Sequence, residues 1–526
     1  MLAQSPSAFL DALAELREAS YQDKETIIDR LTASGHSSTQ AVLSAFLEDR
    51  LYFRSSDQTV FIAKPAGDDA PSLALVDPLS LGDAGSAARD DLTKIGTNNR
   101  IRKVLKTSVA RFALSSPDRS IRLDAVKEML RSLDDASVAT LSARVGMETD
   151  PQVKEEIETG LAIAALDSAD AKTRLTALNV LAHRLRPEVR NRVAALLDKS
   201  PDGAFLERDP QVRQAATDAV SRIDRWRRLY GAIETLFFGL SMGSVLVLVA
   251  IGLAITFGVM GVINMAHGEL MMLGAYTTYV VQLAMPNQIG ISVLIAIPAA
   301  FVVAGAAGVV LERTIIRFLY GRPLETLLAT FGVSLVLQQA VRSMFSANNR
   351  SVETPAWMSG TLQLNEALAT TYNRLYIVVF TLIVFAALVV VLKRTRLGLD
   401  IRAVSQNRAM AQAMGVRTEW VDAVTFGLGS GIAGIAGVAL SQLTNVGPNL
   451  GQSYIIDSFM VVVFGGVGNL WGTLVGGLSM GVVNQLLEPY AGAVLAKIFV
   501  LVALILFIQW RPRGLFPQTG RAAESQ

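Results

Sequence analysis

The strongest constraint on the fold is a series of long apolar segments in the second half of the chain. A helix needs about 20 apolar residues to cross a bilayer. Backbone polar groups find no water in lipid, so such segments must be helical. Eight stretches qualify: residues 233–257, 262–285, 288–311, 323–345, 374–392, 421–443, 457–487 and 491–510. The sequence therefore predicts a polytopic α-helical membrane domain at residues 229–517 with about eight hydrophobic segments, followed by a polar tail at residues 518–526.

One of these segments is too long and too rich in glycine for a single regular crossing. Residues 457–487 contain the run Gly465-Gly-Val-Gly468, followed by Asn469. A broken or re-entrant helix is tolerated in a membrane where its backbone lines protein or water, and broken helices carry solute sites in many transporters. We therefore expect a break here, and Gly465, Gly466 and Asn469 become candidates for a translocation pathway or gate.

A cluster of polar residues interrupts the apolar sequence just after the first segment. Asn264, His267 and Glu269 lie close together in an otherwise apolar run. A charged side chain at the bilayer centre costs roughly 2.5–3.5 kcal/mol on insertion scales, so these residues must face protein or water. We predict that they line a translocation pathway or gate. The alternative is that they brace neighbouring helices and never touch solute, and the residue types leave both readings open.

Residues 1–228 have the composition of a soluble domain, and helix starts repeat within them. Ser116-Pro-Asp, Asp150-Pro-Gln and Asp209-Pro-Gln each precede an apolar helical pattern. Asp or Ser caps the free amides and Pro is tolerated in the first turn, while recurring copies are typical of stacked helix pairs. We expect an all-α fold, in which a HEAT-like helical-repeat domain precedes the membrane domain. Only a small hairpin near residues 50–63 interrupts it, and residues 64–85 are expected to be a loop.

Basic residues predict which side of the membrane each loop faces, because Lys and Arg concentrate in short cytoplasmic loops. They cluster at residues 313–322, at residues 393–417 and in the C-terminal tail. Counting crossings back from the first of these loops puts the N-terminal domain in the periplasm. The group Arg222, Arg225, Arg227 and Arg228 directly before the first crossing favours the opposite side.

Residues 395–416 form an amphipathic loop between two crossings, in which Gly415 can end a helix. Its apolar residues fall on one helical face: Leu399, Ala403, Val404, Ala411 and Met414. The pattern predicts a short helix that docks into a partner. The alternative is that it lies on the membrane surface, but the loop lacks the Trp or lysine-rich face expected of such a helix. The chain carries no G-x-x-x-x-G-K-[ST] phosphate-binding loop. A pump built on it needs ATP hydrolysis in separate subunits, so we expect no catalytic residue and no cofactor in this chain.

Composition argues against several other function classes. With no cysteine and three scattered histidines, disulfides and thiol catalysis are excluded and no metal site is expected. Acidic and basic residues alternate in the N-terminal domain, so no nucleic-acid groove is expected. The run Gly429-Ser-Gly-Ile-Ala-Gly434 matches G-x-G-x-x-G, but it lies inside an apolar crossing and predicts close helix packing.

Several motifs in the membrane half resemble those of the LivH type of branched-chain amino acid ABC permease. They are Gly261-Val-Ile-Asn-Met-Ala-His-Gly-Glu, the loop from Arg396-Leu-Gly to Met414-Gly-Val, Phe464-Gly-Gly-Val-Gly-Asn-Leu-Trp-Gly and Arg511-Pro-Arg-Gly-Leu-Phe516. The resemblance covers residues 231–517 and implies that the loop is received by the ATPase. The implied coupling residues are Arg396, Gly398, Arg402, Arg408, Met414 and Gly415.

Within that family, the long N-terminal domain and the closing Arg-Pro-Arg-Gly-Leu-Phe-Pro are most similar to the urea-permease type. The similarity implies a bacterial inner-membrane importer that carries urea or a close short amide into the cytoplasm. It also implies a second LivM-like permease subunit, two ABC ATPase subunits, an extracytoplasmic solute-binding protein and surrounding membrane lipid as partners. The alternatives are a branched-chain amino acid ABC permease, and a passive channel or secondary transporter for small polar solutes.

Overall fold

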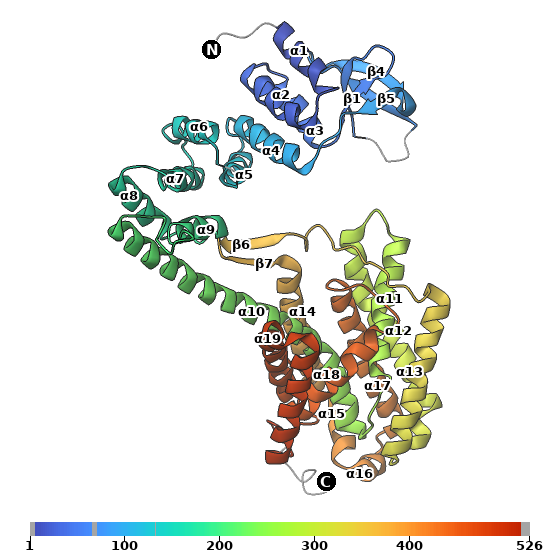
Figure 1. The fold of residues 1–526 in the computed structure, drawn as a ribbon. Helices are drawn as coiled ribbons and strands as arrows, with labels where there is room; N and C mark the ends of the chain where they lie inside the picture. The colour runs from blue at the N-terminus through green and yellow to red at the C-terminus, as the bar shows by residue number, and fades with distance from the viewer. Residues whose placement is uncertain (1–5, 66–70, 132, 517–526) are drawn as a thin grey trace. The chain divides into compact units, whose positions relative to one another are not determined.

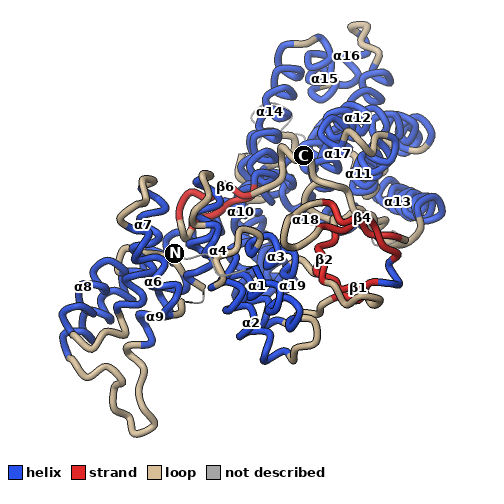
Figure 2. The backbone as a smooth tube through the Cα atoms, turned by 90° about the horizontal axis from the view of Figure 1, so that it is seen from above, coloured by secondary structure: helices blue, strands red, loops and turns tan. Residues whose placement is uncertain are grey.

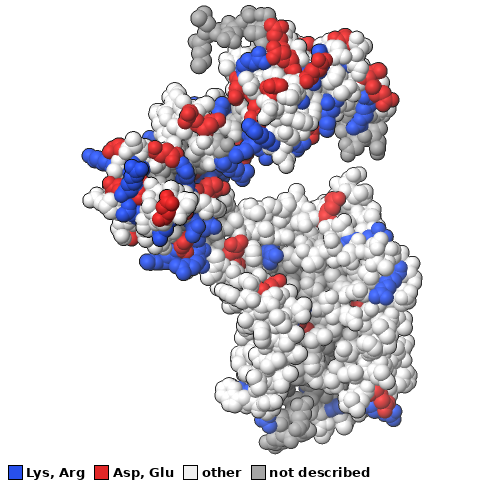
Figure 3. All heavy atoms as spheres, viewed as in Figure 1, with Lys and Arg blue, Asp and Glu red and all other residues white. Residues whose placement is uncertain are grey.

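The computed structural model describes residues 6–65, 71–131 and 133–516. The chain forms two compact units that divide between Arg227 and Arg228 (Figure 1). The predicted polar tail at residues 518–526 lies outside the described residues. On the face drawn in Figure 3, charged side chains cover much of the first unit, whereas the second unit is mostly uncharged.

The first unit opens with three helices and a sheet. The helices are α1 (Pro6–Leu16), α2 (Tyr21–Ala33) and α3 (Thr39–Leu47). The strands are β1 (Leu51–Arg54), β2 (Val60–Ala63), β3 (Ser72–Val76), β4 (Asp83–Ala88) and β5 (Leu92–Lys94), with the short 3-10 helix η1 (Arg89–Asp91) before the last. They pair antiparallel in the order β4-β3-β2-β1-β5, and Figure 2 shows them curving round in red.

The all-α prediction is therefore wrong. The expected hairpin exists, with Leu51 opposite Ile62, but it is the centre of a five-stranded sheet. The predicted loop at residues 64–85 instead contains β3 and the start of β4. Strand β3 alternates exposed and buried positions over only five residues, and β4 has the sequence Asp-Ala-Gly-Ser-Ala-Ala, which lacks β-branched and aromatic residues. Pairing between strands, which local sequence does not reveal, makes these segments β-structure.

The rest of the first unit is a stack of helices. They are α4 (Asn99–Ala113), α5 (Arg119–Leu130), α6 (Asp135–Val145), α7 (Pro151–Ala165), α8 (Ala171–Leu181), α9 (Pro187–Ala195) and the start of α10 (Pro210–Met260). Asp118, Asp150 and Asp170 cap helix starts through their side chains. The stack shares one apolar core, but the sheet before it means that residues 1–228 are not a HEAT-like repeat domain throughout.

An arginine just inside the helix start recurs in this stack. Arg122 donates to the carbonyl oxygens of Ser116 and Pro117, both at 3.0 Å. Arg174 makes the same contacts with residues 168 and 169, and Arg213 with residues 207 and 208. These bonds satisfy loop carbonyls that the helices cannot reach. The repeated sequence pattern therefore fixes each loop to the helix that follows it.

The second unit is mainly helical. After the end of α10 come α11 (His267–Ala284), α12 (Ile289–Thr314), the 3-10 helix η2 (Ile316–Leu319) and α13 (Pro323–Phe345). A hairpin of β6 (Thr361–Asn365) and β7 (Leu368–Thr371) leads into α14 (Tyr372–Arg394). The remaining helices are α15 (Arg396–Gln406), α16 (Arg408–Ala413), α17 (Thr418–Ser441), α18 (Leu450–Gly465) and α19 (Leu470–Trp510).

The expected count of about eight membrane segments is also wrong. Among the described residues, six helices are long and apolar enough to cross a membrane: α10, α12, α13, α14, α17 and α19. Helix α18 is apolar but shorter. The segment at 262–285 is diluted by the polar start of α11. The last two predicted segments are divided differently, because α18 and the first arm of α19 share residues 457–487 and α19 continues to Trp510, with non-helical geometry at Gly492.

Helix α17 is the centre of the second unit. Its apolar stretch is 83% buried and it packs against both α11 and α12. Glycine permits this approach, since a Cβ at Gly437 would overlap the carbonyl oxygen of Met271 on α11. The G-x-G-x-x-G match at residues 429–434 lies within this buried helix, and a Cβ at Gly434 would meet the side chain of Ala304 at 2.7 Å.

Candidate functional site

The polar cluster at the start of α11 is buried among helices. Glu269 is 1% exposed, and its Oε1 accepts hydrogen bonds from Ser334 Oγ at 3.0 Å and from Gln338 Nε2 at 2.8 Å, both on α13. Its Oε2 is buried without a hydrogen-bond partner among the described residues. The carboxyl group thus ties α11 to α13.

His267 and Asn264 make similar internal contacts. The Nε2 of His267 lies 3.0 Å from the carbonyl oxygen of Val249 on α10, and its ring is fully buried. The Oδ1 of Asn264 accepts a hydrogen bond from the backbone amide of Ala266 at 3.0 Å. The structure brings Asn264, His267 and Glu269 to one region where α10, α11 and α13 pack together. Their assignment to a pathway or gate stays a prediction.

The chain leaves helical geometry between α18 and α19. Gly466 and Gly468 have φ angles of 102° and 77°, which glycine adopts readily. The side chain of Asn469 caps α19 by accepting from the amides of Trp471 and Gly472. The C-terminal segment closes this corner, because Leu515 and Phe516 donate backbone hydrogen bonds to residues 464 and 465. Gly465, Gly466 and Asn469 therefore form a backbone corner covered by the end of the chain.

The loop between α14 and α17 folds as two short helices rather than one. Apolar side chains of α15 and α16 pack against the ends of α10 and α14 and the start of α17, which fixes the loop to one end of the unit (Figure 1). Thr395 caps α15, Asn407 caps α16, and Gly415 follows with a φ of 88°. Gly398 is buried directly against the backbone of Leu392.

Two of the predicted coupling arginines have partners within this unit. Arg402 donates to the carbonyl oxygen of Leu392 near the end of α14. Arg408 forms an ion pair with Asp422 of α17, and its guanidinium lies 4.9 Å from the ring centroid of Tyr320. The side chain of Asp422 is only 1% exposed, whereas that of Arg408 is 43% exposed. These contacts brace the loop.

The outward face of the same loop carries three exposed apolar side chains. Leu399 is 59% exposed, Met410 60% and Met414 79%. Arg396 is exposed as well. Exposed apolar side chains gathered on one loop mark an interaction surface. Contact of this loop with an ATPase stays a prediction.

A polar pocket at the opposite end was missed in the sequence. Its volume is about 270 Å³, and it is lined by α10, α14, α17, α18 and the two arms of α19. At its wall, Lys497 Nζ lies 2.7 Å from Asp457 Oδ2. Each residue is a charged side chain in a predicted apolar segment, which is a recognisable sequence signal. Because 40 residues separate them, the sequence does not show that they form a pair. The other polar residues of the lining are Arg374, Thr444, Tyr454, Asn484, Gln485 and Glu488.

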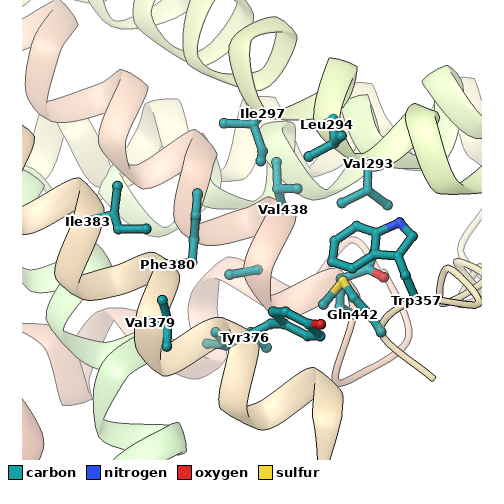
Figure 4. Close-up of a pocket in the computed structure, with 13 residues that line it drawn as sticks. Val293, Leu294, Ile297, Trp357, Tyr376, Val379, Phe380, Ile383, Val438 and Gln442 are labelled. Carbon is teal, nitrogen blue, oxygen red and sulfur yellow. The ribbon is translucent and has the colours of Figure 1, made fainter. Parts of the chain in front are cut away.

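A second pocket, of about 220 Å³, lies between α12 and α14 with α17 behind it (Figure 4). Aromatic and aliphatic side chains line it, including Trp357, Tyr376 and Phe380. Gln442 is the one amide in the lining. A polar solute would find few hydrogen-bond partners here, so this pocket is a poorer candidate for a translocation site.

Comparison with known proteins identifies the family of the membrane unit. Residues 235–509 match the family described as the branched-chain amino acid transport system permease component. The chain belongs to this permease family. The permease BraD of Pseudomonas aeruginosa, named for high-affinity branched-chain amino acid transport, is 31% identical over 55% of this chain and 96% of BraD. LivH of Escherichia coli K12, which carries the same description, is 30% identical over 54% of this chain and 94% of LivH.

A more distant relative is the ribose import permease RbsC of Escherichia coli K12, at 24% identity over 52% of this chain and 85% of RbsC. No solved structure matches. As a member of the family the chain is a multi-pass membrane permease component that lacks an ATPase domain. Almost half of it lies outside the match, since the relatives align over nearly their whole length.

Proposed function

We propose that the chain is the membrane-spanning permease of an ABC importer in the bacterial inner membrane. The observation that carries this proposal is the loop at residues 395–416, which is braced from within and presents Leu399, Met410 and Met414 outward. Such a loop suits reception by an ATPase. The remaining partners follow the family pattern: two ATPase subunits, a second permease subunit and an extracytoplasmic solute-binding protein.

We place the N-terminal unit on the periplasmic side. Val259, near the end of α10, packs at the loop end of the membrane unit, while Met242 and Leu246 of the same helix line the pocket at the other end. If the loop is cytoplasmic, the chain enters the membrane from outside. The arginines at residues 222–228 oppose this orientation. A cysteine at exposed Met147 should then react with an impermeant maleimide in spheroplasts, and protection would reverse the orientation.

Branched-chain amino acids are the first candidate solute, supported by the transport named for BraD and LivH. Urea is the second candidate. It is supported by the extra N-terminal unit, which lies outside the family match, and by the resemblance of the chain's motifs to urea-type permeases. Both solutes combine hydrogen-bond donors with acceptors, and they differ in charge and in the presence of an apolar side chain.

Uptake by the assembled importer in proteoliposomes tests the proposal. Labelled leucine and labelled urea are compared with ATP inside and outside the vesicle. We expect accumulation of one of them that requires ATP on the cytoplasmic face, together with solute-stimulated ATP hydrolysis. Uptake that persists without hydrolysable ATP would instead establish a channel or secondary transporter and overturn the proposal.

A further inference from the structure

Of the two pockets described above, the one around Asp457 and Lys497 is the more polar. Ionisable residues in membrane segments are costly and usually mark a transport pathway. Asp457 is 6% exposed, whereas half of the Lys497 side chain is accessible. The pair therefore has a buried acceptor in the wall and a cation whose side chain is partly accessible.

The same wall also contains a buried polar atom without a hydrogen-bond partner in the described part of the chain. The Oδ1 of Asn484 is buried without a hydrogen-bond partner among the described residues. A buried carbonyl oxygen of this kind is unfavourable unless water or a ligand donates to it. The polar groups of the lining thus include the Asp457 carboxylate and the Asn484 amide oxygen as acceptors and the Lys497 ammonium group as a donor.

The position of the pocket fits entry of solute from outside. Arg374 lies in the first turn of α14, whose other end packs on α15. Leu440, Leu443 and Thr444 lie at or just after the end of α17, whose start also packs on the loop. The pocket is therefore at the end opposite the coupling loop. Lys497 and Asn484 lie on separate arms of α19, which are divided at Pro489 and at Gly492, whose φ is 77°.

We infer that this pocket is the outer solute-binding site of the permease, taking a small solute with an acceptor group at one end and N–H donors at the other. The acceptor group receives a hydrogen bond from Lys497, and the N–H groups donate to Asp457 and Asn484. A zwitterionic amino acid presents its carboxylate and ammonium in this way, and urea presents its carbonyl and amide groups. The volume of about 270 Å³ restricts the site to such small molecules.

Apolar residues complete the pocket, among them Met242, Leu246, Leu440 and Leu443. They give a branched aliphatic side chain an apolar surface that urea does not need. The inference rests on the proposed importer function but not on which of the two solutes is carried, and the leucine and urea arms of one experiment separate them.

Because the chain contains no cysteine, a single thiol can report on the pocket. Gln485→Cys places a thiol in the lining, and Gln363→Cys, on exposed β6, is the matched control. In the assembled importer we expect a charged methanethiosulfonate added outside to modify both. Leucine or urea, supplied with the binding protein, should slow modification of Gln485→Cys alone by about tenfold or more at saturation. Equal rates with and without the transported solute would overturn the inference.

A double substitution tests the ion pair without leaving an unpaired charge. Asp457→Asn with Lys497→Gln should lower solute uptake about tenfold or more, while the amount of assembled complex stays unchanged. The matched control is Arg322→Gln with Glu325→Gln, an exposed pair outside the pocket. Normal uptake by the double variant would refute the site. Absence of uptake by the unsubstituted importer would refute the proposed function instead.

Discussion

The ion pair between Arg408 and Asp422 gives a prediction with a definite asymmetry. The carboxylate is enclosed, with 1% of its side chain exposed, while the guanidinium is 43% exposed and can reach water. Removing one partner of a fully buried pair costs about 3–5 kcal/mol because the other charge is left uncompensated. Removing one partner of an exposed pair costs about 0–1 kcal/mol. Substituting Arg408 should therefore cost more free energy than substituting Asp422.

We expect Arg408→Gln to destabilise the anchoring of α16 by about 3 kcal/mol, at the lower end of the buried range. We expect Asp422→Asn to cost about 1 kcal/mol, since Arg408 then turns to solvent. The difference of about 2 kcal/mol corresponds to roughly 30-fold in the local opening equilibrium. The double substitution should resemble Asp422→Asn, because no buried charge remains.

Hydrogen exchange of the α16 amides in the assembled importer measures this opening, and solute-stimulated ATP hydrolysis reports its consequence for coupling. Exchange should accelerate most in Arg408→Gln, and stimulation should fall in the same order. Arg417→Gln, which removes an exposed charge from the same loop, is the control. Equal acceleration in the two single variants would refute the asymmetry, and unchanged exchange in both would refute the anchor itself.

Three further predictions concern other parts of the chain. In the first unit, burial alone would raise the pKa of Glu148, but hydrogen bonds led by that from Arg122 lower it to about 2. The resulting stabilisation of the folded unit, ~3 kcal/mol, is present above the ordinary pKa and is lost as pH falls toward 2. Hydrogen exchange of α5 and α7 amides in the full chain should therefore accelerate over this pH range, and less so in Glu148→Gln. Gly437→Val should abolish folded permease, since its side chain meets the backbone of Met271, whereas Gly332→Ala, with open space around it, should not; equal yields in membrane extracts would contradict this. Glu269→Gln keeps an acceptor for its partners on α13 and should assemble normally, whereas Glu269→Leu should cost about 2 kcal/mol and lower the midpoint of thermal aggregation, and identical midpoints would argue against bracing.

Local sequence predicted most of the membrane helices but misjudged how the last ones divide. Helices α12, α13, α14 and α17 begin and end close to the predicted apolar segments, because about 20 apolar residues can be accommodated in lipid only as a helix. The end of the chain was harder. Residues 464–469 form a corner that is completed by backbone hydrogen bonds from Leu515 and Phe516. No local sequence pattern predicts that contact.

The roles of side chains depended still more on tertiary structure. The loop at 395–416 was predicted to dock into a partner, but only the structure shows that Arg402 and Arg408 contact α14 and α17 while Leu399, Met410 and Met414 are exposed. Asn264, His267 and Glu269 were recognisable as polar residues in an apolar setting, but only the fold shows which helices they join.

The sequence by itself determined that this chain is a membrane permease component with a separate N-terminal part, because apolar length and local motifs are properties of contiguous residues. The tertiary structure decided the five-stranded sheet, whose strands are defined by their pairing, and the polar pocket, whose Asp457 and Lys497 come from different helices. Both arise from contacts between residues distant in the chain. A hydropathy pattern shows which residues of a segment must be buried or paired, but not which other segment contacts them.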